Sequence, residues 1–114
     1  MTLTNDQITT LQSNLHASIA NTKQSASQCP DSTQTAQLAD KAEQMADQEC
    51  DLETQLFSHQ TLEVSAAAGD AFDGAHGFTQ QLSAMSSSLD KYSKIMDLAG
   101  KVIEAATKLL QLLP

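Results

Sequence analysis

The chain has 114 residues, a net charge of −8 at pH 7, only 4% aromatic residues and no tryptophan. This length predicts a single domain with a modest core of aliphatic side chains. Nucleic acids and anionic membranes attract clustered lysine and arginine, so the acidic balance argues against both as the primary ligand.

The N-terminal part predicts a first helix over residues 5 to about 25. Thr4 and Gln7 have the spacing of a capping box, and Asp6 suits the positive end of a helix dipole. The apolar residues follow one narrow helical stripe, made of Ile8, Leu11, Leu15 and Ile19. The first residues lack the basic and apolar segments of a signal peptide. We therefore expect a cytoplasmic protein, or one exported by a route without a cleaved signal peptide.

A second helix is predicted over residues 33 to 67, because Pro30 and Asp31 mark a break and a new start. The positions expected to face a neighbouring helix, referred to below as the seam of the helix, follow one another at alternating steps of four and three residues. They are Leu38, Ala42, Met45, Glu49, Leu52, Leu56 and His59. Three of the four glycines lie within residues 69–77, which predicts a loop there. Cys29 and Cys50 are expected to be free thiols, because a helix over residues 33 to 67 would hold them too far apart for a disulfide.

The stretch over residues 78–113 predicts one long third helix. Its seam again alternates steps of four and three residues, through Phe78, Leu82, Met85, Leu89, Tyr92, Met96, Ala99, Ile103, Ala106, Leu110 and Leu113. From Ile95 onwards, Val102 and Leu109 widen the apolar face, which indicates contact with two neighbouring helices. Charged residues interrupt this apolar stretch, so we expect no membrane span.

These elements predict an all-α fold with one domain over residues 1–114. Short connections between long helices favour antiparallel neighbours. We therefore expect a three-helix antiparallel bundle with coiled-coil-like packing. The second and third helices would form a long hairpin, and the shorter first helix would fold back along the second.

Two apolar sets are candidate interaction surfaces. The first lies at the expected hairpin tip and is either a small core that closes the tip or a docking site for another helix. It consists of Phe57, Leu62, Phe72, Phe78 and Leu82. The second set is Leu98, Ala105 and Leu112, on a side that two neighbouring helices do not account for. It is either an oligomer face or surplus burial within one chain.

The sequence contains only weak signals for a metal-binding or catalytic site. Asp70, Asp73 and His76 are candidate metal ligands in the glycine-rich segment, but their spacing matches no calcium loop and such residues are common in turns. Glu49 and Glu53 lie one helical turn apart and could share a proton, although a polar seam residue that fixes helix register also explains Glu49. We expect no enzymatic activity and no metal or other cofactor.

In size, acidity and richness in Ser, Thr, Gln and Ala, the chain is similar to small helical hairpins exported by bacterial secretion systems. It lacks the Trp-x-Gly turn that marks one such family. Two functional hypotheses follow. The chain is an adaptor, inhibitor or chaperone-like module that binds a protein partner through the apolar tip or an acidic helix face. Alternatively, it is a homo-oligomeric structural subunit of a filament or secretion-type complex.

Overall fold

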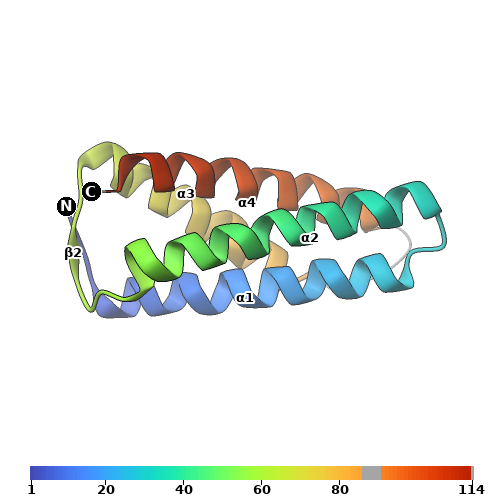
Figure 1. The fold of residues 1–114 in the computed structure, drawn as a ribbon, viewed down its shortest axis with the longest axis horizontal. Helices are drawn as coiled ribbons and strands as arrows, with labels where there is room; N and C mark the ends of the chain where they lie inside the picture. Colours follow the sequence, from blue (N-terminus) through green and yellow to red (C-terminus); the bar gives the residue numbers. More distant parts are fainter. Residues whose placement is uncertain (86–90, 114) are drawn as a thin grey trace.

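The computed structural model describes residues 1–85 and 91–113. In this part of the chain four α-helices lie along the long axis of a body that measures 44 × 21 × 20 Å (Figure 1). The elements in chain order are β1 (Thr2–Leu3), α1 (Asn5–Gln28), α2 (Ser32–Leu52), the π-helix η1 (Glu53–Phe57), β2 (Leu62–Glu63), α3 (Ala66–Ser83) and α4 (Tyr92–Leu112). The prediction of an all-α helical bundle is confirmed, but the expected number of three helices is wrong.

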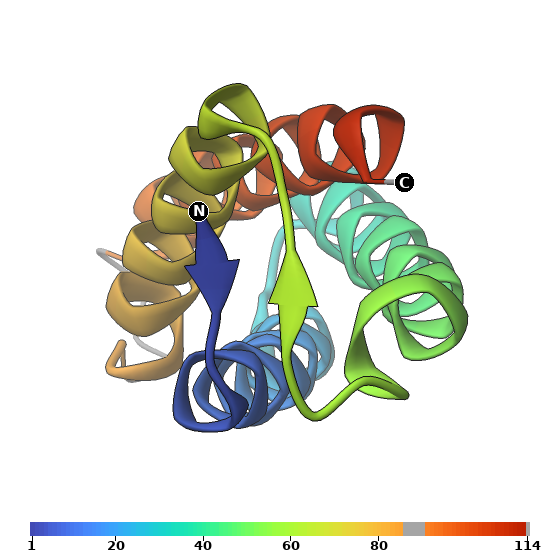
Figure 2. The same ribbon diagram turned by 90° about the vertical axis from the view of Figure 1, so that its left-hand side faces the viewer.

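The four helices form a square in cross-section. α1 packs against α2 and α3, and α4 packs against the same two helices, so that α2 and α3 occupy opposite corners (Figure 2). The segment from η1 through β2 crosses the end of the bundle, where both termini lie. α4, which contains most of the predicted third helix, does pack against α2, but the two helices run in the same direction and α3 lies between them in the chain, so the predicted antiparallel hairpin is wrong.

The first helix begins as predicted. The Gln7 backbone N–H donates to Thr4 Oγ1 at 3.3 Å, and the Thr4 N–H donates to Gln7 Oε1 at 2.9 Å. α1 continues to Gln28, beyond the apolar stripe, because polar side chains on its inner face are buried and hydrogen-bonded. Ser18 Oγ, for example, donates across the interface to the Thr79 carbonyl at 3.0 Å.

The second helix is shorter than predicted. α2 ends at Leu52 and passes through η1 to Phe57, after which the chain becomes extended and β2 pairs with β1 in antiparallel register. The Met1 and Val64 backbones exchange two hydrogen bonds, of 2.9 and 2.8 Å. This pairing joins residues about sixty positions apart, so a local pattern cannot reveal it.

The glycine-rich segment is helical, so the predicted loop over residues 69–77 is wrong. Ser65 caps α3 by accepting a hydrogen bond from the Ala68 N–H at 3.1 Å. Five alanines within α3 favour the helix and offset the glycines. A Cβ at Gly69 would meet Met1 Sδ, which is the end of a flexible and exposed side chain that can move aside.

The predicted single helix over residues 78–113 is also wrong within the described residues. α3 ends at Ser83, α4 begins at Tyr92, and the two helices pack against each other. The part of that prediction at residues 86–90, which includes Leu89 of the seam, lies outside the described residues. Asn21 Nδ2 on α1 donates to the carbonyls of Leu82, Ser83 and Met85 at 2.8–3.2 Å, which satisfies free acceptors where α3 ends.

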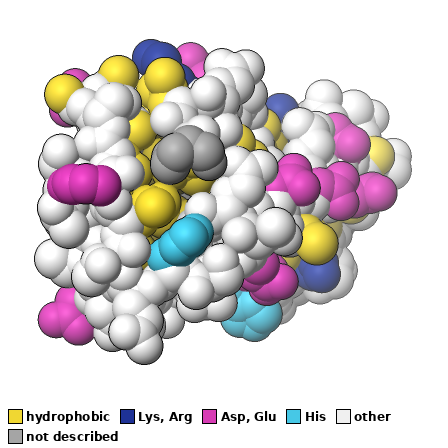
Figure 3. Space-filling view, turned by 60° about the vertical axis from the view of Figure 1, so that its left-hand side comes forward, with side chains coloured by type: hydrophobic (Ala, Val, Ile, Leu, Met, Phe, Trp, Pro, Cys, Tyr) yellow, Lys and Arg dark blue, Asp and Glu magenta, His cyan; other side chains and the backbone are white. Residues whose placement is uncertain are grey.

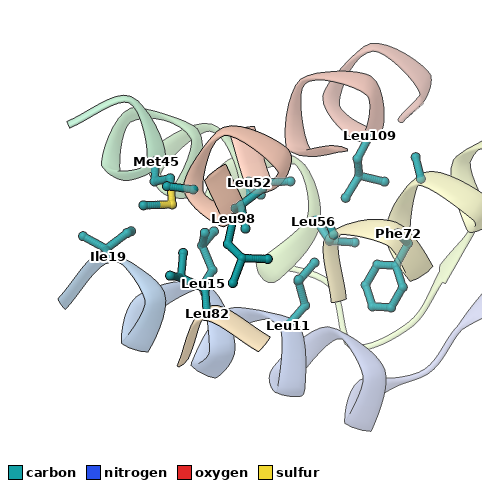
Figure 4. Packing of buried hydrophobic residues seen from close by; sticks show 14 of the residues in the cluster. Leu11, Leu15, Ile19, Met45, Leu52, Leu56, Phe72, Leu82, Leu98 and Leu109 are labelled. Carbon is teal, nitrogen blue, oxygen red and sulfur yellow. The ribbon is translucent and has the colours of Figure 1, made fainter. Parts of the chain in front are cut away.

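The core lies between all four helices, and side chains from each of them converge on it (Figure 4). Ile95, Val102 and Leu109 are each fully buried, which confirms the broad apolar face predicted for this part of the chain. None of the helices in the described ranges combines the length and the hydropathy that a bilayer-spanning helix needs.

Candidate functional site

A groove of about 510 Å³ runs between α3 and α4 on the outside of the bundle. Its floor is apolar and its rims carry charged side chains. The lining residues are Ala67, Asp70, Ala71, Gly74 and Phe78 from α3, and Lys101, Glu104, Ala105, Lys108 and Leu112 from α4.

Each helix contributes a stripe with steps of four, three and four residues. On α3 the stripe is Ala67, Ala71, Gly74 and Phe78, and on α4 it is Lys101, Ala105, Lys108 and Leu112. This spacing places each set along one face of its helix. These two stripes of the groove, referred to below as the α3 stripe and the α4 stripe, therefore follow the helices for about three turns.

Contacts across the groove show that the two stripes run in opposite directions. Lys101 Nζ lies 5.7 Å from the centre of the Phe78 ring. A Cβ built on Gly74 would lie 4.0 Å from the Ala105 Cβ, at ordinary contact distance. The middle of the groove is thus bordered by the smallest side chains, whereas Phe78 and Leu112 lie towards its two ends.

The charged groups on the rims are exposed and mostly unpaired. Lys101 Nζ pairs with Asp97 Oδ2 at 3.4 Å. Asp70, Glu104 and Lys108 form no hydrogen bond or ion pair with any described residue. These three charges are therefore available to a bound molecule.

The structure separates the residues of the predicted hairpin tip. Phe72 and Leu82 are buried in the core, at 2% and 0% exposure. Phe57 and Leu62 are half-buried, in η1 and β2, whereas Phe78 lines the groove. Hydrophobic side chains do gather at the end of the bundle where the termini lie, and acidic side chains surround them more often than lysines do (Figure 3).

The structure also separates the residues of the second predicted surface, which are Leu98, Ala105 and Leu112. Leu98 is buried at 6% exposure, as surplus burial within one chain would require. Ala105 and Leu112 line the groove, and Leu112 is 38% exposed. Phe78 from the first predicted surface and these two residues from the second therefore meet at one site.

The candidate metal ligands point to different sides of α3. Asp70 lines the groove, whereas Asp73 and His76 line a separate hollow of about 290 Å³ against the start of α1. The His76 ring stacks on Phe72 with ring centres 6.4 Å apart. Within residues 1–85 and 91–113, no three His, Cys, Asp or Glu side chains are grouped so that they could hold a metal ion.

Glu49 makes a contact between helices. Its Oε2 lies 3.3 Å from His16 Nδ1, so this carboxylate joins α2 to α1. This contact supports a role for Glu49 in fixing the position of α2 against α1, rather than a role in sharing a proton with Glu53. Cys29 is half-buried, Cys50 is exposed, and both are free, as expected.

Comparisons of the chain with protein-family models, curated proteins and solved structures found no match. The geometry of the groove is therefore the basis for a function. The sequence does contain a signal for its α3 side, because Ala67, Ala71, Gly74 and Phe78 follow one another at steps of four, three and four, although the step from Phe78 to Leu82 is again four. The three glycines in this segment predict a loop instead, so the sequence pattern as a whole does not indicate a helical face there.

Proposed function

We propose that the chain is a non-enzymatic interaction module that binds an α-helix of a protein partner in the groove between α3 and α4. The observation that carries this proposal is the pair of antiparallel stripes with heptad-like spacing. A helix that lies lengthwise between two others inserts its side chains between such stripes. This arrangement is the helix-in-groove mode of peptide recognition.

The dimensions of the groove support a helical occupant. Each stripe spans eleven residue steps, so its length is roughly 16 Å, or three helical turns. Gly74 and Ala105 at the middle leave room for large side chains of the partner. Burial of one Leu, Ile or Phe side chain contributes about 1.5–3 kcal/mol. Three such anchors contribute about 4.5–9 kcal/mol, and a cost of association of at least about 4 kcal/mol leaves binding in the submillimolar range or weaker.

A direct test uses an 18-residue amphipathic peptide with leucine at the heptad a and d positions and glutamine on both flanks. Binding is measured by fluorescence anisotropy for the wild-type chain and for Ala105→Leu, which fills the groove from within. We expect Ala105→Leu to weaken binding by about tenfold, the equivalent of about 1.4 kcal/mol, because it occupies the volume that the central anchor needs.

The matched control is Ala36→Leu, the same substitution at an exposed position on α2, which does not line the groove. This variant should bind the peptide as the wild-type chain does, and both variants should keep a helical far-UV circular dichroism spectrum. Absence of binding to the wild-type chain, or equal binding by Ala105→Leu, would contradict the proposal.

A further inference from the structure

Two unpaired charges of opposite sign, Asp70 on the α3 rim and Lys108 on the α4 rim, lie at nearly the same level of the groove. Gly74 faces Ala105 and Phe78 faces Lys101, so equal rise along antiparallel helices places Asp70 level with Lys108. Both side chains are exposed, and neither forms an ion pair with a described residue. An occupant of the groove would therefore meet a carboxylate on its α3 side and an ammonium group on its α4 side.

We infer that the helix bound in this groove belongs to a different protein and carries acidic residues on the flank facing α4 and a basic residue on the flank facing α3. This inference rests on the proposed function. Lys101 and Lys108 lie seven residues apart, so they occupy equivalent positions along the α4 stripe. Two acidic residues seven apart on the partner helix would face both of them.

The surroundings of the lysines make Lys108 the stronger of the two contacts. Lys101 already pairs with Asp97, whereas Lys108 forms no ion pair with a described residue. Glu104 is on the same helix, three residues after Lys101, and it faces the same rim. Glu104 also lies four residues before Lys108, so this rim carries charges of both signs, and Lys108 is its lysine without an ion pair to a described residue, opposite the carboxylate of Asp70.

A second copy of the chain fits the groove less well than a different protein. Two copies would each bring a net charge of −8, and this repulsion opposes their association. The occupant must also offer a ridge of large apolar side chains along one helix. In the described ranges the exposed large hydrophobic residues are Met1, which precedes β1, and Leu112, which ends α4, so they form no ridge along one helix.

The test compares peptides that keep the leucine positions of the neutral peptide and differ in their flanks. One peptide has glutamate on one flank and lysine on the other, a second has lysine on both, and a third has glutamate on both. We expect the mixed peptide to bind the wild-type chain about fivefold more tightly than the other two, as expected for exposed ion pairs. The preference should disappear in 0.5 M salt, where such pairs are screened.

Charge reversal on the protein gives a sharper result. Lys108→Glu makes both rims acidic, so this variant should bind the peptide with lysine on both flanks more tightly than the other two peptides. Asp70→Lys should likewise bind the peptide with glutamate on both flanks most tightly. The double variant Asp70→Lys/Lys108→Glu should again prefer the mixed peptide, because a helix that turns end for end in the groove exchanges its two flanks.

The reversed direction can be observed directly. A nitroxide label on the N-terminus of the mixed peptide should broaden resonances at one end of α3 in the wild-type chain and at the other end in the double variant. Lys23→Glu is the matched control, since Lys23 is an exposed lysine on α1 and does not line the groove. This control should retain the preference of the wild-type chain.

The outcomes separate the two proposals. If the peptides bind at the groove with equal affinity and the charge reversals change nothing, the inferred charge pattern is wrong and the helix-binding function stands. If Ala105→Leu leaves the binding of all peptides intact, the helix-binding function itself is wrong. Formation of a homodimer that the mixed peptide cannot displace would overturn the assignment to a different protein.

Discussion

Substitution of Gly77 tests the largest difference between the sequence pattern and the structure. The sequence suggests a loop over residues 69–77, whereas the structure places Gly77 in the interior of α3. A Cβ at Gly77 meets no atom within 4 Å, so alanine adds no steric conflict. Gly77→Ala should therefore gain the full difference in helix propensity, about 0.8–1.0 kcal/mol in the free energy of unfolding.

Gly77→Pro should have the opposite effect. Proline in a helix interior removes a backbone hydrogen bond and clashes with the preceding turn, at a cost of about 3 kcal/mol or more. Both variants are measured by urea unfolding, followed by circular dichroism at 222 nm. In thermal unfolding followed at the same wavelength, the melting temperature of Gly77→Ala should rise by about 4 °C for a domain of this size.

Gly100→Ala is the control, because Gly100 lies in a helix in both the prediction and the structure, and a Cβ there also meets no atom within 4 Å. It should stabilise the chain by a similar amount. A stabilising Gly100→Ala together with a Gly77→Pro variant as stable as the wild-type chain would refute a helix at residue 77.

Two further substitutions test the packing that holds α3 in place. Phe72→Ala removes a ring that is 2% exposed and should lower the free energy of unfolding by about 3–5 kcal/mol in the same urea assay. A loss below about 1 kcal/mol would contradict the place of Phe72 in the core. Asn21→Ala removes three hydrogen bonds to carbonyls where α3 ends and should cost about 1–3 kcal/mol. Hydrogen exchange should then accelerate in the last turn of α3, and unchanged exchange there would show that Asn21 does not hold this helix end.

The features that the sequence predicted correctly depend on local pattern. The capping box at Thr4 is a signal within four residues, and the structure forms both of its hydrogen bonds. The apolar face of α4 is likewise a local property, because spacing alone determines which side chains share a face of a helix. Ile95, Val102 and Leu109 are accordingly fully buried.

Helix continuity was not predictable in the same way. A seam with steps of four and three residues shows which face is apolar, and it is the same for one long helix as for two helices that both face a core. The sequence holds one hint against continuity, the three consecutive serines at 86–88, because serine is a poor residue for a helix interior. The pairing of Met1 with Val64 had no local signal at all.

The candidate site was found only in part for the same reason. The sequence pattern singles out Phe78, Ala105 and Leu112 but places them on two different surfaces, whereas all three line the groove. Their meeting depends on the reversal of the chain between α3 and α4. The opposition of Asp70 and Lys108 depends on the same reversal, and residues so far apart in sequence cannot be paired by spacing.

The most direct measurement of the helix-binding claim is a chemical-shift titration of isotope-labelled chain with the mixed peptide. The claim predicts that the largest changes follow the two stripes, over residues 67–78 of α3 and 101–112 of α4. Changes centred instead on Phe57 and Leu62 at the end of the bundle, or on α1 and α2, would show that the groove is not the binding site.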